Sequence, residues 1–320
     1  MSRYDNIARA KEIIEKRRVH ALTVADMRNE EVRAKSDRIA KIDEELTATG
    51  PAIFKAAIRG EDITPIKQRN LELNAERKKE LAALGLPEDY TEIRYHCKAC
   101  SDTGYTEDGR LCSCFRKEIS DETIKSSGIG RLIERQSFDN FDIEWYKGDP
   151  EAYQKMKDNL EYAKQFSREF SKTGETLFLF GTTGTGKTHL SSAIAKEAIL
   201  GGYEVIYDSV QNIISDYEYD RFKSGYGPYE PRSTKYIECD LLIIDDLGTE
   251  FVNQFTLSCI YNILNTRQNR GLATVVSTNL TTNEFSEKYE ARISSRLFGN
   301  ETHVLKFIGP DHRLGNFKRR

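Results

Sequence analysis

The sequence has no long apolar run and little net charge. No stretch of the 320 residues approaches the roughly 20 apolar residues that a membrane-spanning helix needs. Residues 1–18 are charged throughout and lack the apolar core of a secretory signal peptide. The formal net charge of −3 supplies no general attraction for nucleic acid, so any such site must be a local patch. We therefore expect a cytoplasmic protein with no membrane partner.

Cysteine is scarce too, with six residues, and cytoplasmic thiols stay reduced, which excludes a disulfide framework. Four of the six nevertheless gather in one short segment: Cys97, Cys100, Cys112 and Cys114. The intervening residues are rich in turn formers, so the two close pairs can meet across a hairpin-like loop. Four thiolates predict a closed, structural Zn²⁺ site. The C-x-C half departs from the commoner C-x-x-C, which leaves His96 as an alternative ligand.

The chain before these cysteines is expected to be helical. Its periodicity predicts one long helix or a helix pair over residues 1–46, a break at Thr47–Pro51, and further helices over 53–58 and 66–84. So few apolar residues make either a small bundle or a partner-docking arm, and the two are compatible. The expected organisation has four parts: a helical partner-binding region (1–90), a zinc module (91–120), a connector (121–170) and an ATPase domain (171–320).

The most specific motif is Gly181–Thr188, which matches G-x-x-x-x-G-K-[ST]. It lies between a predicted strand, 176–180, and a predicted helix, 189–195, as a phosphate-binding loop must. Glycines let backbone N–H groups turn toward phosphates, and the helix N-terminus adds its positive dipole. Lys187 is expected to reach the β- and γ-phosphates, and Thr188 to bind Mg²⁺. The predicted ATP contacts are Gly181, Thr182, Thr183, Gly184, Thr185, Gly186, Lys187, Thr188 and His189.

Further strands and helices alternate after this loop. Apolar strands are expected at 204–207, 241–244, 273–277 and 303–307, with helices at 210–222 and 255–270. Buried strands joined by helices indicate an α/β fold with a five-stranded parallel sheet covered on both faces.

Two acids end the third strand. Asp245 is placed to hold Mg²⁺, and Asp246 to orient or deprotonate the attacking water. Asn279, after the fourth strand, is placed to position water near the γ-phosphate or to begin a helix. Arg292 and Arg296 share a helix face, which is either solvated or supplies an arginine finger to a neighbouring subunit.

Together these motifs resemble the AAA+ ATPases of the DnaC/DnaI-type bacterial helicase-loader family, and the related IstB-type transposition helpers. The similarity covers most of the chain and is strongest from about Phe138 to Arg313. It implies strand order 5-1-4-3-2, Asn279 as sensor 1, Arg296 as the finger, with Arg292 as the alternative, and Arg313 as sensor 2. Asp246 stands where many AAA+ enzymes carry Glu, which implies slow hydrolysis.

The resemblance implies an ATP-dependent loader that delivers a hexameric DnaB-type replicative helicase onto single-stranded DNA, self-associates through its ATPase domain, and uses ATP, Mg²⁺ and Zn²⁺. The cysteine cluster and helical front resemble the DnaI-like subset, in which this part grips the helicase. The alternatives are an IstB-type transposition helper and a non-hydrolysing, ATP-gated adaptor. Rings and cations interleaved over residues 217–236 favour a single-stranded DNA contact over a solvated loop, because rings stack on unpaired bases while cations hold phosphates.

Overall fold

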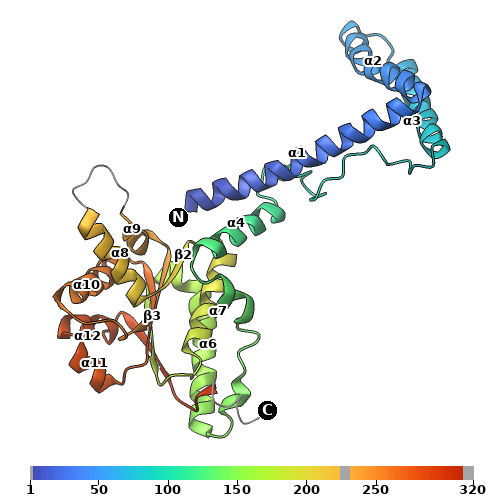
Figure 1. Cartoon of the computed structure of the whole chain (residues 1–320). Coiled ribbons are helices and arrows are strands. Elements are labelled where there is room, and N and C mark those ends of the chain that lie inside the picture. Colours follow the sequence, from blue (N-terminus) through green and yellow to red (C-terminus); the bar gives the residue numbers. More distant parts are fainter. Residues whose placement is uncertain (1–2, 224–230, 313–320) are drawn as a thin grey trace. The chain divides into compact units, whose positions relative to one another are not determined.

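The computed structural model describes residues 3–223 and 231–312, and the chain divides into two compact units (Figure 1). One unit is Lys11–Phe115, and the other is Arg116–Arg320 together with Met1–Ala10. None of the described helices is long and apolar enough to cross a membrane.

The first unit is built from helices α1 (Arg3–Lys35), α2 (Asp37–Arg59) and α3 (Thr64–Ala83). Ser36 separates α1 from α2, because its backbone is extended and its hydroxyl accepts a hydrogen bond from the N–H of Ile39. This is an ordinary N-cap, which satisfies one of the donors that a helix start leaves unpaired. The predicted helix pair is therefore correct, with its boundary at Ser36.

The predicted break at Thr47–Pro51 is wrong, because α2 runs through it and carries Pro51 inside the helix. Proline removes one backbone hydrogen bond and normally kinks or ends a helix. Here α2 packs along α3, and Asn70 of α3 donates to the Thr49 hydroxyl at 2.7 Å. Packing between the two helices outweighs the local cost of the proline.

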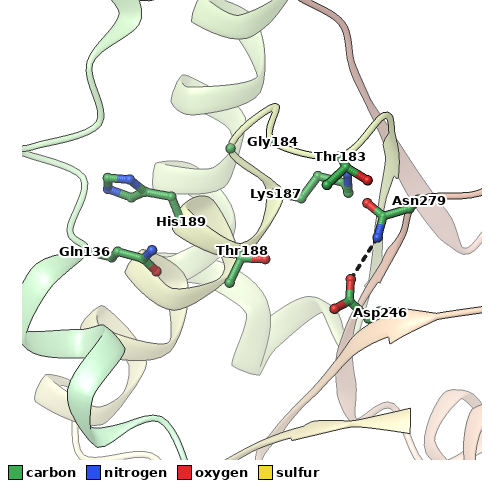
Figure 2. Close-up of a pocket in the computed structure, with 9 residues that line it drawn as sticks. Gln136, Thr183, Gly184, Lys187, Thr188, His189, Asp246 and Asn279 are labelled. Atoms are coloured by element: carbon green, nitrogen blue, oxygen red, sulfur yellow. Dashed lines mark hydrogen bonds between the residues drawn. The ribbon is translucent and has the colours of Figure 1, made fainter. Parts of the chain in front are cut away.

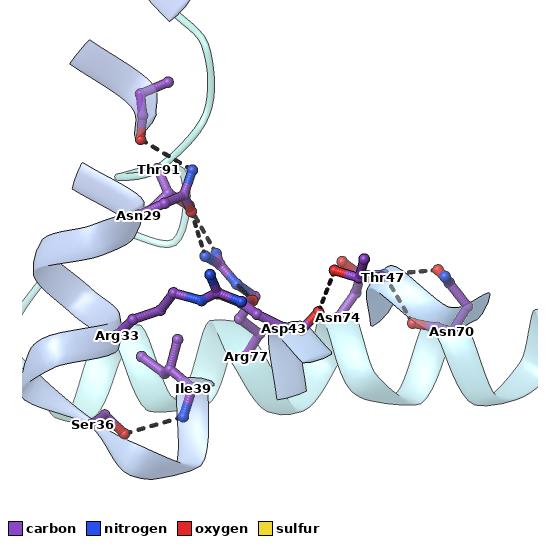
Figure 3. A network of polar contacts seen from close by, with 11 residues as sticks. Asn29, Arg33, Ser36, Ile39, Asp43, Thr47, Asn70, Asn74, Arg77 and Thr91 are labelled. Atoms are coloured by element: carbon purple, nitrogen blue, oxygen red, sulfur yellow. Dashed lines mark hydrogen bonds and ion pairs between the residues drawn. The ribbon is translucent and has the colours of Figure 1, made fainter. Parts of the chain in front are cut away.

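A polar network around Arg77 joins the helices of this unit (Figure 3). The Arg77 guanidinium donates to Asp43 of α2, Asn29 of α1 and Thr91 beyond α3, each at 2.7 Å. Arg33 of α1 adds a second ion pair to Asp43 at 3.2 Å. Since only 14% of either the Arg77 or the Asp43 side chain is exposed, the network fixes the alignment of the helices in a unit with a small apolar core.

The second unit is an α/β domain built on one parallel sheet, in the order β2-β3-β4-β1-β5. The strands are β1 (Thr176–Gly181), β2 (Val205–Ser209), β3 (Leu241–Leu247), β4 (Ala273–Thr278) and β5 (Thr302–Phe307). The five predicted strands and their parallel pairing are confirmed, and so is the order 5-1-4-3-2 that the resemblance implied.

Helices cover both faces of the sheet (Figure 1). They do so because the strands present apolar side chains on each face, which must be buried. One face packs on α5 (Gly130–Arg135), α6 (Pro150–Thr173) and α7 (Lys187–Leu200). The other packs on α8 (Val210–Lys223), α9 (Thr234–Glu238), α10 (Gln254–Asn269), α11 (Thr282–Lys288) and α12 (Ala291–Leu297). The remaining elements are α4 (Ser113–Ser126) and the 3₁₀ turn η1 (Ile143–Tyr146). The carboxyl ends of β1, β3 and β4 consequently meet at one edge, with β4 in the middle.

Candidate functional site

The loop between β1 and α7 has the backbone that its glycines predict. Gly181 and Gly184 have φ values of 148° and 77°, which disfavour residues with a Cβ. A Cβ on Gly181 would lie 2.1 Å from the Phe307 carbonyl oxygen, and one on Gly184 would lie 1.8 Å from Asp311 Oδ1. The His312 N–H also donates to the Gly184 carbonyl at 3.0 Å. The segment after β5 therefore packs directly on the loop.

Lys187 opens helix α7 and is nearly fully buried. Its Nζ donates to the carbonyl oxygens of Gly181 and Thr182, both at 2.7 Å, so the ammonium group is held across the loop. Thr188 and His189 follow in the first turn, where unpaired N–H groups and the helix dipole attract anions. This end of α7 is therefore suited to bind phosphate groups.

A pocket of about 170 Å³ lies over this helix end (Figure 2). It is lined by Gln136, Thr183, Gly184, Gly186, Lys187, Thr188, His189, Asp246 and Asn279. The phosphate loop, the second acid of β3 and the asparagine beyond β4 thus share one cavity, as the parallel sheet requires.

Hydrogen bonds fix the two acids of β3 in different ways. Asp245 accepts from the Tyr207 hydroxyl at 2.7 Å through Oδ2, and from the Ser277 hydroxyl through Oδ1. Asp246 has a left-handed backbone, with φ 55°, and its N–H donates to Ser277 Oγ at 3.0 Å. Asn279 donates from Nδ2 to Asp246 Oδ1 at 3.0 Å, as drawn in Figure 2. The second acid and the asparagine therefore form a pair facing the phosphate loop.

A second cavity, also of about 170 Å³, adjoins the first at Gly186 and His189. It is lined by Asn140, Phe141, Asp142, Trp145, Tyr146, Gly186, His189 and His312. Tyr146 donates from its hydroxyl to the Thr185 carbonyl at 2.9 Å, which ties the cavity to the phosphate loop. Burial lowers the pKa of His189 and of His312, so both rings are neutral near pH 7.

The sequence argument missed this second cavity and Gln136 of the first one. Segment 137–142 falls within the expected connector of 121–170, and its two phenylalanines, Phe138 and Phe141, were the available signal. Gln136 carries no such signal. Its side-chain oxygen is buried and has no hydrogen-bond partner in the part of the chain that the structure describes.

The two arginines of α12 line a separate hollow of about 340 Å³. Their guanidinium carbons lie over the Tyr261 ring, Arg292 at 4.9 Å and Arg296 at 5.9 Å from its centroid. Arg296 is held further by the side-chain oxygens of Asn265 and Gln268, whereas Arg292 is exposed and pairs with Glu290 at 2.8 Å. Neither arginine lines the pocket over the start of α7 in its own chain. Arg313 lies outside the described residues.

The aromatic and basic stretch of 217–236 is only partly a surface. Tyr236 is fully buried and stacks on the half-buried Tyr217 with ring centroids 6.4 Å apart, so Tyr236 belongs to the core and cannot stack on a base. Phe222 is 76% exposed, and Arg232 lies 3.7 Å over the Tyr219 ring. The exposed rings and cations near the end of α8 are Tyr219, Arg221, Phe222, Lys223 and Arg232, with the half-buried Lys235 beside them. Tyr226 and Tyr229 lie outside the described residues.

The four clustered cysteines converge in the first unit, with all four sulfur atoms within 4.8 Å of one another. Cys97 and Cys112 are 3.7 Å apart, and Cys100 and Cys114 are 3.5 Å apart. Thiolates around tetrahedral zinc, with Zn–S bonds of about 2.3 Å, are spaced by about 3.8 Å, so the sulfurs fit this ion. His96 is not part of the group.

The side chain of Asp102 holds the start of the cysteine loop through its backbone N–H groups. The carboxylate of Asp102 accepts from the N–H groups of His96 at 2.7 Å and Cys97 at 2.8 Å. A backbone hydrogen bond at Cys114 lowers the pKa of the Cys112 thiol to about 7, whereas burial raises the pKa of Cys97. The low pKa of Cys112 favours the thiolate form that binds metal.

Comparison with known proteins identifies the family. The family described as IstB-like ATP binding protein matches residues 129–306, which is more than half of the chain. The chain belongs to this IstB-like family. The match spans the phosphate loop, both acids of β3, Asn279 and the arginines of α12, so these residues lie in an ATP-binding domain.

Named relatives of this IstB-like protein act in replication or belong to a phage-like element. It is 29% identical over 184 residues to the replicative helicase loader DnaC of Escherichia coli strain K12, covering 57% of this chain and 71% of DnaC. It is 27% identical over 212 residues to the phage-like element PBSX protein XkdC of Bacillus subtilis strain 168, covering 61% and 76%.

Solved structures similar to the IstB-like domain include a crystal structure of DnaI and one of the DnaC helicase loader. DnaI is 23% identical with a TM-score of 0.44, covering 57% of this chain and 93% of DnaI. DnaC is 20% identical with a TM-score of 0.43, covering 48% and 90%.

Proposed function

We propose that this protein is an ATP-dependent loader that delivers a hexameric replicative DNA helicase onto single-stranded DNA. The observation that carries the proposal is the convergence of Lys187, Asp246 and Asn279 on one pocket over the helix end of a phosphate loop. The relatives named as replicative helicase loaders support the biological role.

The contacts of these residues support the catalytic assignment. Lys187 and the loop N–H groups would bind the β- and γ-phosphates, and Thr188 and Asp245 would hold Mg²⁺, which would neutralise phosphate charge. Asp246, oriented by Asn279, accepts the proton of the attacking water. An aspartate reaches less far than a glutamate, so slow hydrolysis is expected.

The second cavity is the proposed site of the adenine base. It adjoins the phosphate pocket, is walled by aromatic rings, and holds a buried His312 Nε2 that has no hydrogen-bond partner in the described chain. Rings stack on a flat base, and the free imidazole nitrogen offers it one hydrogen bond.

Arg296 is the proposed arginine finger for a neighbouring copy. It is half-buried and held by Tyr261, Asn265 and Gln268, so it is pre-organised, whereas Arg292 forms an exposed ion pair. Since neither arginine lines its own chain's pocket, ATP hydrolysis is expected to need self-association. Arg313 remains the proposed sensor 2.

The helical region 1–90, next to the zinc module of 91–120, is the proposed helicase-binding part. Phe54 and Ile58 of α2 and Leu71 of α3 are 65–70% exposed, which is unusual for large apolar side chains. The zinc ion would brace the loop that follows. The exposed rings and cations near the end of α8 are the proposed single-stranded DNA contact.

The test is an affinity pull-down from native lysate with ATP present, read by mass spectrometry. We expect the replicative helicase to be recovered, and to be lost from a Phe54→Ser, Ile58→Ser double variant. Lys187→Ala is the matched control, because it should lose ATP binding and keep the helicase. Loss of both activities in Lys187→Ala would contradict this separation of roles.

A transposition helper is the second candidate, because the matching family is named after IstB. Recovery of a transposase and no helicase in the same pull-down would support it and leave the ATPase assignments intact. A non-hydrolysing adaptor is the third, and the short Asp246 side chain favours it. Undetectable phosphate release with intact ATP binding would support this candidate.

A further inference from the structure

Tyr207 lies on β2, at the open edge of the sheet, and its backbone is held by a corner of another segment. The Tyr207 N–H donates to the Ser127 carbonyl at 3.0 Å, just beyond the end of α4. Gly128 follows with φ 84°, and a Cβ there would lie 2.8 Å from the Tyr207 carbonyl oxygen. The corner Ser127–Gly128 thus closes tightly on the edge strand at this residue, and glycine permits the approach.

The Tyr207 side chain points inward and is 7% exposed. Its hydroxyl donates to Asp245 Oδ2 at 2.7 Å and lies 3.1 Å from the Ser191 hydroxyl of α7. Ser191 in turn donates to the Thr188 carbonyl at 3.1 Å. One phenol therefore bridges the two elements, β3 and α7, that supply the proposed Mg²⁺ ligands Asp245 and Thr188.

These contacts constrain how Asp245 can rotate. The Tyr207 hydroxyl occupies one carboxylate oxygen and the Ser277 hydroxyl the other, and each oxygen keeps a further lone pair. Outer hydrogen bonds of this kind orient a ligand before the metal arrives, and losing one typically lowers metal affinity about 10–100-fold.

We propose that Tyr207 is a positioning residue for Mg²⁺, which aims Asp245 at the ion and links the Ser127–Gly128 corner to the magnesium site. The inference rests on the proposed Mg²⁺–ATP site and adds to it a residue that touches neither nucleotide nor metal. It follows that Tyr207 acts on the metal dependence of the reaction, with little effect on nucleotide contacts.

The experiment compares Tyr207→Phe with the wild type in full-length protein. ATP hydrolysis is titrated with Mg²⁺, and binding of a fluorescent ATP analogue is measured in EDTA. We expect the half-maximal Mg²⁺ concentration to rise about tenfold or more, while metal-free nucleotide affinity stays within about twofold, because the ring and the phosphate loop are retained.

Tyr236→Phe is the matched control, since Tyr236 is a buried tyrosine that donates to Asp208 and Asp216 instead of Asp245. Its Mg²⁺ midpoint should match the wild type. Equal shifts in both variants would mean general loosening of the domain and would overturn the proposal. An unchanged midpoint in Tyr207→Phe would overturn it as well.

Folding of each variant is checked by the fluorescence of Trp145, the single tryptophan of the chain. If Tyr207→Phe does not fold, Ser191→Ala takes its place, because it frees the phenol from α7 without touching Asp245. It should raise the midpoint by a smaller factor, and an unchanged midpoint would count against the proposal. A wild type that binds no Mg²⁺–ATP would instead refute the proposed function, so the two failures are distinguishable.

Discussion

Replacement of Arg267 tests what holds the start of β3 and β4 together. Arg267 lies on α10, is fully buried, and its guanidinium group donates to five oxygen atoms and one sulfur atom. The shortest bonds to backbone carbonyls reach Ala273 at 2.6 Å, Cys239 at 2.9 Å and Tyr236 at 3.1 Å. The acceptors lie just before β3 and at the start of β4, so one side chain ties the helix to the beginnings of both strands.

The expected effect of Arg267→Met follows from these bonds. Methionine fills most of the volume but leaves three closely bonded carbonyl groups buried without a donor, at about 1–3 kcal/mol each. Burying an unpaired guanidinium costs several kcal/mol, and its removal offsets part of that loss. We expect a net loss of about 3 kcal/mol of unfolding free energy, which lowers Tm by about 6–12 °C in a domain of this size.

The assay is urea unfolding followed by Trp145 fluorescence, which reports on the ATPase unit alone. Arg270→Met is the matched control on the same helix end, because Arg270 is exposed and its loss should change stability by less than about 0.5 kcal/mol. If Arg267→Met is as stable as the wild type, the bonds to the carbonyls contribute nothing net and the reasoning fails.

Four further predictions follow from other sites. Cys97→Ser with Cys100→Ser should abolish bound metal in elemental analysis and expose the loop to proteolysis; a wild type without zinc would contradict the four-thiolate site. Gly184→Ala should weaken ATP binding, because the Gly184 φ of 77° is strained for a residue with a Cβ and the loop backbone must shift; unchanged affinity would refute this. Arg77→Met should cost the helical unit about 2 kcal/mol in urea unfolding followed by circular dichroism, since Asn29 and Thr91 lose their donor and Asp43 keeps only its ion pair with Arg33; an exposed-site control, Lys78→Met, should be neutral. Burial lowers the pKa of His189, so the unfolded state binds more protons below about pH 6.5. The contribution of His189 to stability is therefore complete above that pH and is lost as the pH falls below it, and a His189→Gln variant with the same slope would argue against the assignment.

The strands and the phosphate loop were predictable because they depend on local pattern. Residues 241–244 are apolar and β-branched or leucine, and no other element fits so short a run before two acids. The expected helix break at Pro51 was wrong because that expectation, too, considered only local sequence. The cost of the proline is local, whereas the Asn70 to Thr49 contact that accompanies it joins residues 21 positions apart.

The residues of the candidate site that belong to sequence motifs could be predicted. Single residues that reach the site only through tertiary contacts could not. Asp246 lies at the carboxyl end of β3 and Asn279 just after the neighbouring strand β4, so the order of the sheet brings them together. Tyr207 is 38 residues from Asp245 in the sequence, and nothing in its strand distinguishes it from other buried aromatic residues. Gln136 reaches the phosphate pocket only because the segment before η1 packs on α7. Such residues become visible only through tertiary packing.

The left-handed backbone at Asp246 restricts which residues natural variation can place there. Glycine, asparagine and aspartate adopt this conformation at low cost, whereas longer or branched side chains do so with strain. Of the three, aspartate alone carries a carboxylate that accepts a proton. Few substitutions of Asp246 are therefore expected to be tolerated. A change to asparagine would keep the backbone conformation and remove the proposed general base.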